Sequence, residues 1–428
     1  MKPTALLVPL TLALMTGCAN TLPAPASAPE FDAGAMDALL SGAVERGEVI
    51  GVSALVFDEG AEVYNGAFGL RDREAGLPVT EDTVWRIYSM TKPMTSAVIM
   101  DLEEEGLLSL SDPVSKFIPS FADVRIARPG ADGSVERVAP RRAITVEDLL
   151  LHTAGLGYGI FGDMTPIEAE YARAQLFRSG ESLADKVDRI AALPLNGEPG
   201  EQWFYSISID VLGRIIEVVT QQSLADAMQA RLFGPLGMDE TAFVLKDGQE
   251  ARFAQLYALT PEGEYVLAPG MAGVGFREDP GFQSGGGGLV STQDDVARFA
   301  QMMLNGGTLD GARILEAETV KRMMSDHLDG RPSVLPWLGG DTGAGFGYGG
   351  SVQLTATPEQ QAESGRYPGQ WGWGGAARTN MFIDPANDSF GIIMLQFFSA
   401  EDPPIHNDFQ AEVLRQTRDL PLAESAAP

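Results

Sequence analysis

Hydrophobic positions in the first hundred residues change between helical and strand-like spacing. Residues 31–48 carry apolar side chains at helical spacing, and two β-rich runs follow at 51–57 and 61–70. The Asp-Glu-Gly turn at 58–60 joins these runs and is a hairpin signal. A further apolar run at helical spacing covers 89–106. The pattern therefore predicts a helix, a hairpin and then a buried helix that begins at Ser89.

The middle of the chain, from 110 to 280, has a different pattern. Apolar residues recur there in short helical stretches separated by loops, and strand signals are sparse. This favours an α-rich insertion at 110–280. The segment 155–162, which contains Tyr158, is too rich in glycine for regular structure and either borders a pocket or serves as a flexible linker. The helices predicted in this region are 145–152, 165–177, 183–193, 207–220 and 224–233.

Strand-like patterns return towards the C-terminus. An amphipathic helix is predicted at 294–304 with Ser291 or Thr292 as its cap, and another at 316–327. Strands at both ends with helices between them predict one antiparallel sheet built from the two termini, which is an α+β arrangement. The cleft between the sheet domain (31–109 and 281–420) and the insertion is the natural place for chemistry. The remaining predicted elements are strands at 347–354, 376–383 and 390–398, a turn at 384–388, a helix at 405–414 and a tail at 421–428.

The first thirty residues have the composition of a targeting segment and not of a folded domain. Lys2 and an apolar stretch at 5–15 are typical of a secretory signal over residues 1–17. The segment that ends at Cys18 resembles a bacterial lipoprotein signal, in which this cysteine becomes lipidated; the alternative is a plain signal peptide with a chance cysteine. Cys18 is the only cysteine of the chain, and residues 18–30 have the Pro/Ala-rich composition of a tether. We expect an exported protein, either a periplasm-facing envelope lipoprotein or, without lipidation, a secreted or periplasmic protein.

Composition and charge narrow the choice of partners. The chain has 428 residues, 44% of them hydrophobic, and a formal net charge of −29. These values indicate a soluble globular body whose acidic surface repels phosphate backbones and anionic headgroups. We therefore expect no nucleic-acid partner and no membrane contact except through a lipid anchor; the pattern gives no indication of the oligomeric state.

Candidate chemistry begins with Ser89 and Lys92. Three residues apart on a helix, they share a face, and Pro93 is tolerated in the first turn. A serine hydroxyl needs a neighbour that takes its proton, and a desolvated lysine can do this or hold another base in its charged form. Backbone N–H groups at the helix start favour an oxyanion. The alternative is a helix-capping serine followed by a solvated lysine.

Two distant stretches offer the missing groups. Tyr205 lies at a loop-to-helix junction, where a phenol near a lysine can ionise and shuttle protons. The Gly-Trp-Gly-Gly-Ala segment at 372–376 enters a strand, and its small residues let a substrate approach backbone N–H groups. Taken alone, Tyr205 also fits a core aromatic residue, and the glycine run also fits a strand bend.

Together these stretches resemble the serine β-lactamase and penicillin-binding protein superfamily, most closely the class C β-lactamase-like carboxylesterases called family VIII. Ser89 to Lys92 matches the first motif, Tyr205-Ser206 the second and 373–375 the third, while 150–156 and 286–292 look like further family stretches. The resemblance implies a β-lactamase/transpeptidase-like fold, with an antiparallel sheet flanked by helices and an inserted α-rich domain.

The resemblance also implies roles for individual residues. It makes Ser89 the nucleophile, Lys92 and Tyr205 the proton-transfer pair, and the backbone N–H groups of Ser89 and Ala376 the oxyanion hole. The candidate substrate-binding residues are Trp373, Gly374, Gly375, Ile207 and Tyr158.

Two departures from class C β-lactamases bear on the substrate. Ile207 stands where those enzymes carry an asparagine that contacts the antibiotic, and Trp373 stands where they carry a lysine that attracts a carboxylate. Losing an amide and a cation disfavours an anionic β-lactam. We therefore expect a carboxylesterase that acts on short- to medium-chain acyl esters, with weak β-lactam hydrolysis as a side activity.

Several alternatives remain beside this interpretation. A β-lactamase or D,D-peptidase is the first of them, and a non-catalytic binding protein is another. A Ser-His-Asp hydrolase would use His152, His327 or His406, but the chain has no G-x-S-x-G motif, and His152 fits a structural histidine. The three histidines and one cysteine show no metal-ligand spacing, and no cofactor is implied.

Overall fold

The central sheet of the protein is built from both ends of the chain. In the computed structural model, β1 (Gly51–Asp58) pairs antiparallel with β2 (Ala61–Asp72) on one side and with β16 (Ser389–Met394) on the other. The full order is β12-β13-β14-β15-β16-β1-β2-β3. Leu55 in the centre of β1 lies opposite Ile392 and Asn65. The predicted antiparallel sheet from the two termini is thereby confirmed.

The structure describes residues 31–129, 135–161, 165, 167–268, 276–277, 281–335, 338 and 342–418. The predicted signal segment, Cys18, the tether and the tail at 421–428 lie outside these residues. From Phe31 onward the chain clusters as one unit, and the predicted boundaries of the insertion stay predictions. Within the described residues, no helix combines the length and apolar character needed to cross a bilayer.

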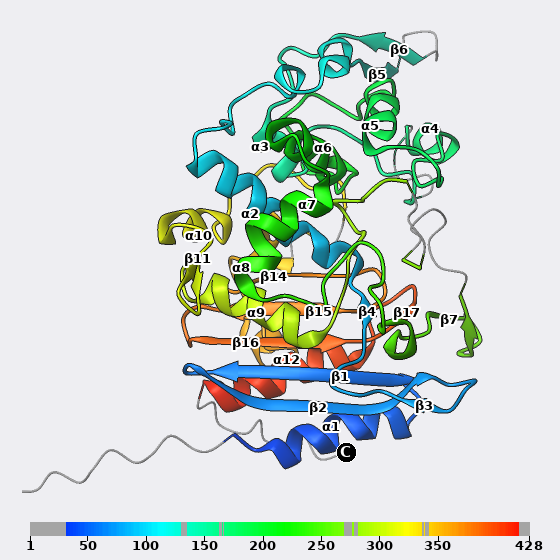
Figure 1. Cartoon of the computed structure of the whole chain (residues 1–428), viewed down its shortest axis with the longest axis vertical. Coiled ribbons are helices and arrows are strands. Elements are labelled where there is room, and N and C mark those ends of the chain that lie inside the picture. Colours follow the sequence, from blue (N-terminus) through cyan, green and yellow to red (C-terminus); the bar gives the residue numbers. More distant parts are fainter. Residues whose placement is uncertain are drawn as a thin grey trace, which may run out of the picture. The chain divides into compact units, whose positions relative to one another are not determined.

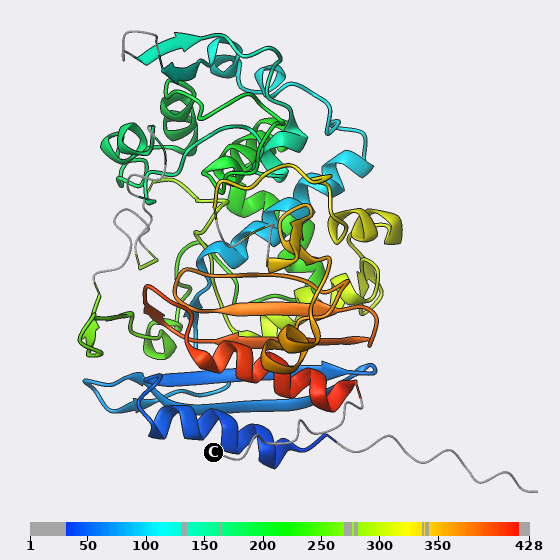
Figure 2. The same cartoon turned by 180° about the vertical axis from the view of Figure 1, so that it is seen from behind.

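Helices cover both faces of the sheet (Figures 1 and 2). The helices α1 (Ala33–Glu45) and α12 (Pro404–Thr417) pack on one face, and α9 (Gln293–Leu304) contacts β1, β15 and β16 from the other. Alternate residues of β1 join the two layers: Val52, Ala54 and Val56 pack towards α1 and α12, whereas Leu55 belongs to the opposite core. A strand buried on both sides explains the nearly continuous apolar run at 51–57.

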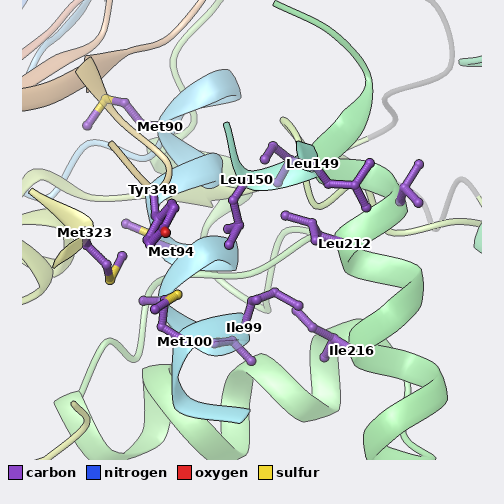
Figure 3. Close-up of a cluster of buried hydrophobic side chains, with 14 of the residues drawn as sticks. Met90, Met94, Ile99, Met100, Leu149, Leu150, Leu212, Ile216, Met323 and Tyr348 are labelled. Atoms are coloured by element: carbon purple, nitrogen blue, oxygen red, sulfur yellow. The ribbon is translucent and has the colours of Figure 1, made fainter. Parts of the chain in front are cut away.

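The helix α2 (Thr91–Glu104) runs through the second core. Every residue from Thr91 to Met100 is buried, as expected for a helix surrounded on all sides. Figure 3 shows its side chains meeting those of α3, α6 and α10. The helix begins two residues later than predicted, because Ser89 lies in a 3-10 turn, η1 (Tyr88–Met90), that leads into it.

The helices predicted between 110 and 280 are present, mostly shorter than the pattern suggested. They are α3 (Val146–Leu150), α4 (Glu168–Arg173), α5 (Leu183–Ala191), α6 (Ser208–Thr220) and α7 (Leu224–Met228), the last followed by a π-helical turn (Gln229–Phe233) and α8 (Gly234–Leu236). Capping boxes at Thr145 and Ser182 set the starts of α3 and α5. Two hairpins were not predicted: β5 (Ile126–Pro129) with β6 (Val135–Val138), and β7 (Tyr257–Leu259) with β8 (Tyr265–Leu267).

The C-terminal elements follow the predicted order with several additions, among them the hairpin of β10 (Thr308–Leu309) and β11 (Ala312–Arg313). Thr292 caps α9, and the turn between β15 and β16 lies at 385–388. The helix α11 (Pro358–Ser364) was not predicted. The other elements are β3 (Leu77–Pro78), β4 (Trp85–Arg86), β9 (Val290–Ser291), β10 (Thr308–Leu309), β11 (Ala312–Arg313), α10 (Ala317–Met323), β12 (Ala344–Phe346), β13 (Ser351–Gln353), β14 (Trp371–Gly374), β15 (Asn380–Asp384) and β17 (Phe397–Phe398), with short 3-10 turns at Val114–Lys116, Pro119–Asp123 and Glu250–Arg252.

Candidate active site

Ser89 and Lys92 meet at the N-terminal end of α2. The Nζ atom of Lys92 lies 3.1 Å from the Oγ atom of Ser89 and donates to the carbonyl oxygen of Gly286 at 2.6 Å. Ser89 is half-buried, whereas Lys92 is only 1% exposed. The alternative of a capping serine beside a solvated lysine is therefore wrong for this pair.

Burial gives Lys92 the character of a base. Removal from water lowers the pKa of Lys92 to about 7, although the negative charge of Asp210 opposes this shift. At neutral pH a large fraction of Lys92 is therefore uncharged, and a neutral amine within hydrogen-bond distance of Ser89 can accept the hydroxyl proton.

The phenol of Tyr205 reaches the same hydroxyl from a different part of the chain. It is hydrogen-bonded to the side chain of Ser89 and accepts a hydrogen bond from Nε1 of Trp373 at 3.3 Å. Lys92 Nζ lies 4.6 Å from the centre of the Tyr205 ring. Burial raises the pKa of Tyr205, and the two hydrogen bonds offset only part of that effect. The phenol therefore stays protonated at neutral pH, contrary to the ionised form considered from the sequence.

Backbone hydrogen bonds hold Tyr205 in place. The N–H of Phe204 donates to the carbonyl of His152 at 3.0 Å, and the N–H of Ile207 donates to that of Gly157 at 3.1 Å. The Tyr205 ring also stacks on Tyr158, with 5.6 Å between ring centres. The loop before α6 is thus fixed on both sides of the phenol.

The two predicted oxyanion-hole residues come from segments that pack directly on each other. A Cβ atom on Gly375 would overlap the carbonyl oxygen of Ile87, which precedes Ser89 by two residues. The turn after β14 can approach so closely only because this position is glycine. It brings the backbone at Ala376 beside the start of η1, and both Ser89 and Ala376 line the same cavity.

The residue before Ser89 has a strained backbone. Tyr88 has a φ of 41°, a left-handed conformation that bulky residues rarely adopt and that costs about 1–3 kcal/mol. Its ring is buried and packs on Phe276 and Phe398, with centres 5.8 and 5.7 Å away. This packing holds the bend that aims the Ser89 side chain into the cavity.

The cavity in front of Ser89 has a volume of about 630 Å³, and aromatic side chains form part of its wall. Of the predicted substrate-binding residues, Tyr158, Trp373, Gly374 and Gly375 line it. Ile207 is 1% exposed and is not among the described residues that line it, so the structure does not place Ile207 against a substrate. Sequence reasoning did not identify Phe161 and Phe177, which complete the aromatic wall.

The three histidines considered as alternative catalytic or metal-binding residues make other contacts. His152 is fully buried, shares a hydrogen bond with Ser206 Oγ at 3.1 Å and packs on Tyr205; burial holds its pKa well below the usual value. Nε2 of His327 faces the carbonyl of Arg322, and Nε2 of His406 faces that of Arg378. Across the described ranges, no group of three or more histidine, cysteine or acidic side chains is arranged to hold a metal ion.

Three further positions around the site were missed by sequence reasoning. The carboxylate of Glu168 accepts the N–H groups of Tyr158 and Gly159 at 2.9 and 2.7 Å and so anchors the glycine-rich segment to α4. Gly286 supplies the acceptor for Lys92. Asp210 lies beneath Lys92 on α6. A glycine run beside a strand signals close backbone approach, but neither acid carries a local signal of its role.

Known proteins resemble this chain over most of its length. Protein Rv1367c of Mycobacterium tuberculosis strain H37Rv is 35% identical over 357 residues, covering 82% of this chain and 87% of that protein. Esterase EstB of Burkholderia gladioli is 32% identical over 375 residues, with the same two coverages. Among solved structures, EstCE1, described as a hydrolase with promiscuous acyltransferase activity, is 27% identical and superimposes with a TM-score of 0.72 over 91% of this chain and 97% of its own.

The family described as Beta-lactamase matches residues 36–415. The match includes every candidate residue around Ser89, and the fold agrees with the β-lactamase-like fold expected from the motifs. Because this match spans most of its length, the chain belongs to the β-lactamase family.

Proposed function

We propose that the protein is a serine carboxylesterase that forms an acyl-enzyme on Ser89. The observation that carries the proposal is the meeting of three remote segments at one hydroxyl: Lys92 Nζ lies 3.1 Å from Ser89 Oγ, and the phenol of Tyr205 is hydrogen-bonded to the same side chain. A buried lysine beside a serine is costly to maintain, and a protein that only binds a ligand has no need of one. The similarity to an esterase such as EstB supports the same activity.

In the acylation step, Ser89 Oγ attacks the ester carbonyl carbon and its proton passes to Lys92. The N–H groups of Ser89 and Ala376 stabilise the negative oxygen of the tetrahedral intermediate. When the intermediate collapses, the leaving alkoxide takes a proton from Tyr205, which is replenished from Lys92. A protonated phenol suits this relay because it donates a proton only as the leaving oxygen becomes basic.

Deacylation repeats these steps with water. Water gives its proton to the Lys92 and Tyr205 pair as it attacks the acyl carbon, and the same pair returns a proton to Ser89 Oγ as the acid departs. Every proton that leaves Ser89 or water is thus accounted for within the site, and no cofactor takes part in the proposed reaction.

The lining of the cavity supports a neutral substrate. Aromatic side chains form the wall beside Ser89, and Trp373 stands where class C β-lactamases carry a cation. The aromatic part of the wall favours apolar acyl or alcohol groups, although Arg366 and Arg378 also line the cavity. We therefore propose short- to medium-chain esters as substrates and weak β-lactam hydrolysis as a side activity.

Acyl transfer to an alcohol is a second candidate. An acyl-enzyme within an aromatic wall can react with an alcohol in place of water, and EstCE1 is described as having such promiscuous activity. The test is to add a short primary alcohol to the ester assay and to measure the new ester against the free acid.

The main proposal is tested by parallel assays of p-nitrophenyl butyrate and a chromogenic cephalosporin. We expect ester turnover to exceed cephalosporin turnover strongly and to disappear in Ser89→Ala. A fluorophosphonate should add its mass to the wild type but not to Ser89→Ala. Ester hydrolysis that persists in Ser89→Ala would exclude the acyl-enzyme, and preferred cephalosporin turnover would favour the β-lactamase alternative.

We further propose that the protein is exported and anchored through a lipid on Cys18. The support is the sequence of residues 1–30, with its apolar stretch, single cysteine and Pro/Ala-rich tether. In a bacterial host, the wild type should sediment with membranes and incorporate an alkyne fatty acid, whereas Cys18→Ser should do neither. Equal labelling of both proteins would show that Cys18 is not the anchor.

A further inference from the structure

A second buried lysine lies behind the proposed site. Lys186 on α5 and Asp210 on α6 form an ion pair with 3.0 Å between Nζ and Oδ1, and their side chains are 0% and 1% exposed. The ammonium group also lies over the rings of Phe177 and Phe282, at 4.5 and 4.2 Å from their centres. Phe177 belongs to the wall of the cavity, so the pair is in contact with the surroundings of the substrate site.

The other oxygen of Asp210 points towards Lys92. Asp210 Oδ2 is buried and has no hydrogen-bond partner among the described residues. The place that a Cβ atom on Gly286 would occupy lies 2.7 Å from this oxygen and 3.6 Å from Lys92 Nζ. The carboxylate and the amine thus both lie close to a position that has no side chain, and a larger residue there would crowd them.

The polar groups around Lys92 divide into neutral and charged ones. Ser89, the hydroxyls of Tyr158 and Tyr205 and the carbonyl of Gly286 are neutral, and His152 stays uncharged because its burial lowers its pKa. The charged groups facing Lys92 are Asp210, which favours its ammonium form, and Lys186, which interacts with it repulsively. Burial sets the lowered pKa of Lys92 in the first place, and the charges of Asp210 and Lys186 adjust it in opposite directions.

We propose that Asp210 and Lys186 act together as a positioning pair that sets the protonation state of Lys92. This inference rests on the proposed function, in which Lys92 is the base for Ser89. Asp210 holds the amine in place and prevents its proton affinity from falling too far. Lys186 neutralises part of the carboxylate, so that Asp210 does not trap Lys92 as a permanent ammonium ion. Neither residue touches the reacting atoms.

The proposal predicts opposite effects for two variants. Removing the negative charge in Asp210→Asn should move the acidic limb of the kcat/KM profile for p-nitrophenyl butyrate to lower pH by roughly 1 unit. Removing the positive charge in Lys186→Met leaves the carboxylate to Lys92 alone and should move the same limb to higher pH by a similar amount. Lys186→Arg, which keeps the charge, should restore a limb close to that of the wild type.

A purely structural ion pair gives a different result. It would lower the amount of folded enzyme in both variants and leave the pH limb in place, and either that outcome or two shifts in the same direction would overturn the proposal. Asp384→Asn is the matched control, because Asp384 at the end of β15 is 0% exposed and pairs at 2.6 Å with Arg418, which caps α12. This variant should lose stability without moving the limb.

The double variant Asp210→Asn/Lys186→Met keeps the proposal testable where a single variant does not fold. It buries no unpaired charge, and its limb should lie between those predicted for Asp210→Asn and Lys186→Met, because it loses both opposing charges. A double variant whose limb moves as far as the shift predicted for either single variant would contradict this balance of charges. Failure of the proposed function is recognised separately, because it would appear as ester turnover that survives in Ser89→Ala.

Discussion

The two buried lysines of this protein show how differently one side chain behaves in two neighbouring regions. Lys92 at the start of α2 is 1% exposed, and its hydrogen-bond partners among the described residues are the neutral oxygens of Ser89, Tyr158 and Gly286. Lys186 on α5 is 0% exposed but binds a carboxylate directly. Burial lowers the pKa of both, and Asp210 opposes that effect through a direct hydrogen bond only at Lys186. The nearest oxygen therefore decides whether a buried lysine is a base or a counter-ion.

The largest expected effect comes from replacing the two lysines by methionine. Lys92→Met should lower kcat for p-nitrophenyl butyrate by about 10⁴-fold, because Ser89 loses its base. Lys186→Met should retain kcat within about tenfold at its own pH optimum, since it removes no group in contact with Ser89. Steady-state kinetics of both variants across pH provides the measurement. Equal losses in the two variants would refute the distinction between base and counter-ion.

The stability of the two variants should follow the opposite order: Lys92→Met, which loses more activity, should be the more stable protein. Lys92→Met removes a costly buried amine and should raise the Tm by about 4 °C at pH 6, whereas Lys186→Met strands Asp210 and should cost about 3 kcal/mol. The pKa of Lys92 is about 7 in the folded protein and 10.5 in its ordinary state. Below pH 7 the folding penalty of Lys92 is complete, and it fades as pH rises towards 10.5. The Tm advantage of Lys92→Met should therefore shrink above pH 7, which thermal unfolding at several pH values can measure.

The next effect concerns Tyr205, the phenol beside Lys92 that has no counterpart beside Lys186 in the described part of the chain. Tyr205→Phe keeps the ring beside Lys92 but removes the hydroxyl that relays protons, and we expect kcat to fall by about 10³-fold. Tyr158→Phe is the matched control: its hydroxyl lies 3.5 Å from Lys92 Nζ but has no part in the proposed proton relay, so its loss should cost about tenfold or less. Normal turnover of Tyr205→Phe would remove this residue from the mechanism.

A smaller effect is expected from pH alone in the wild type. Because Lys92 must be uncharged to accept the Ser89 proton, kcat/KM should rise about tenfold per unit below pH 7 and level off above it. Circular dichroism at pH 5 would verify that the protein remains folded. A flat profile between pH 5 and 9 would mean that Lys92 is not the base.

The sequence was sufficient for the sheet and for the catalytic candidates because both depend on local patterns. The hairpin at 51–70 and the strand at 390–398 each show strand spacing, and Ser89 with Lys92 shows its arrangement within one helical turn. The Lys186–Asp210 pair could not be predicted in this way. Lys186 lies on α5 and Asp210 on α6, so no local spacing connects them. From the sequence alone, a charged residue on a helix is expected at the surface.

The local start of α2 also escaped prediction for a physical reason. Helical spacing continues smoothly back to Ser89, but Tyr88 adopts a left-handed conformation because its ring packs on Phe276 and Phe398. Tertiary contacts therefore set a bend that residue preferences disfavour. Ile207 shows a second limit of sequence reasoning. A residue next to a catalytic motif need not face the cavity, and Ile207 packs in the hydrophobic core.

The smallest predicted effect tests how strongly the indole supports the phenol. Trp373→Phe removes the Nε1–H group that donates to Tyr205 at 3.3 Å but keeps an aromatic ring against Phe346, with centres now 5.2 Å apart. Without this donor the pKa of Tyr205 should rise further, because the hydrogen bond lowers it. Proton relay to the leaving group should change little for p-nitrophenol, which is a good leaving group, and by about threefold to tenfold for an alkyl ester with a basic leaving group. Comparing kcat for the two ester types isolates this contribution, since a change in packing alone would reduce turnover of both esters equally.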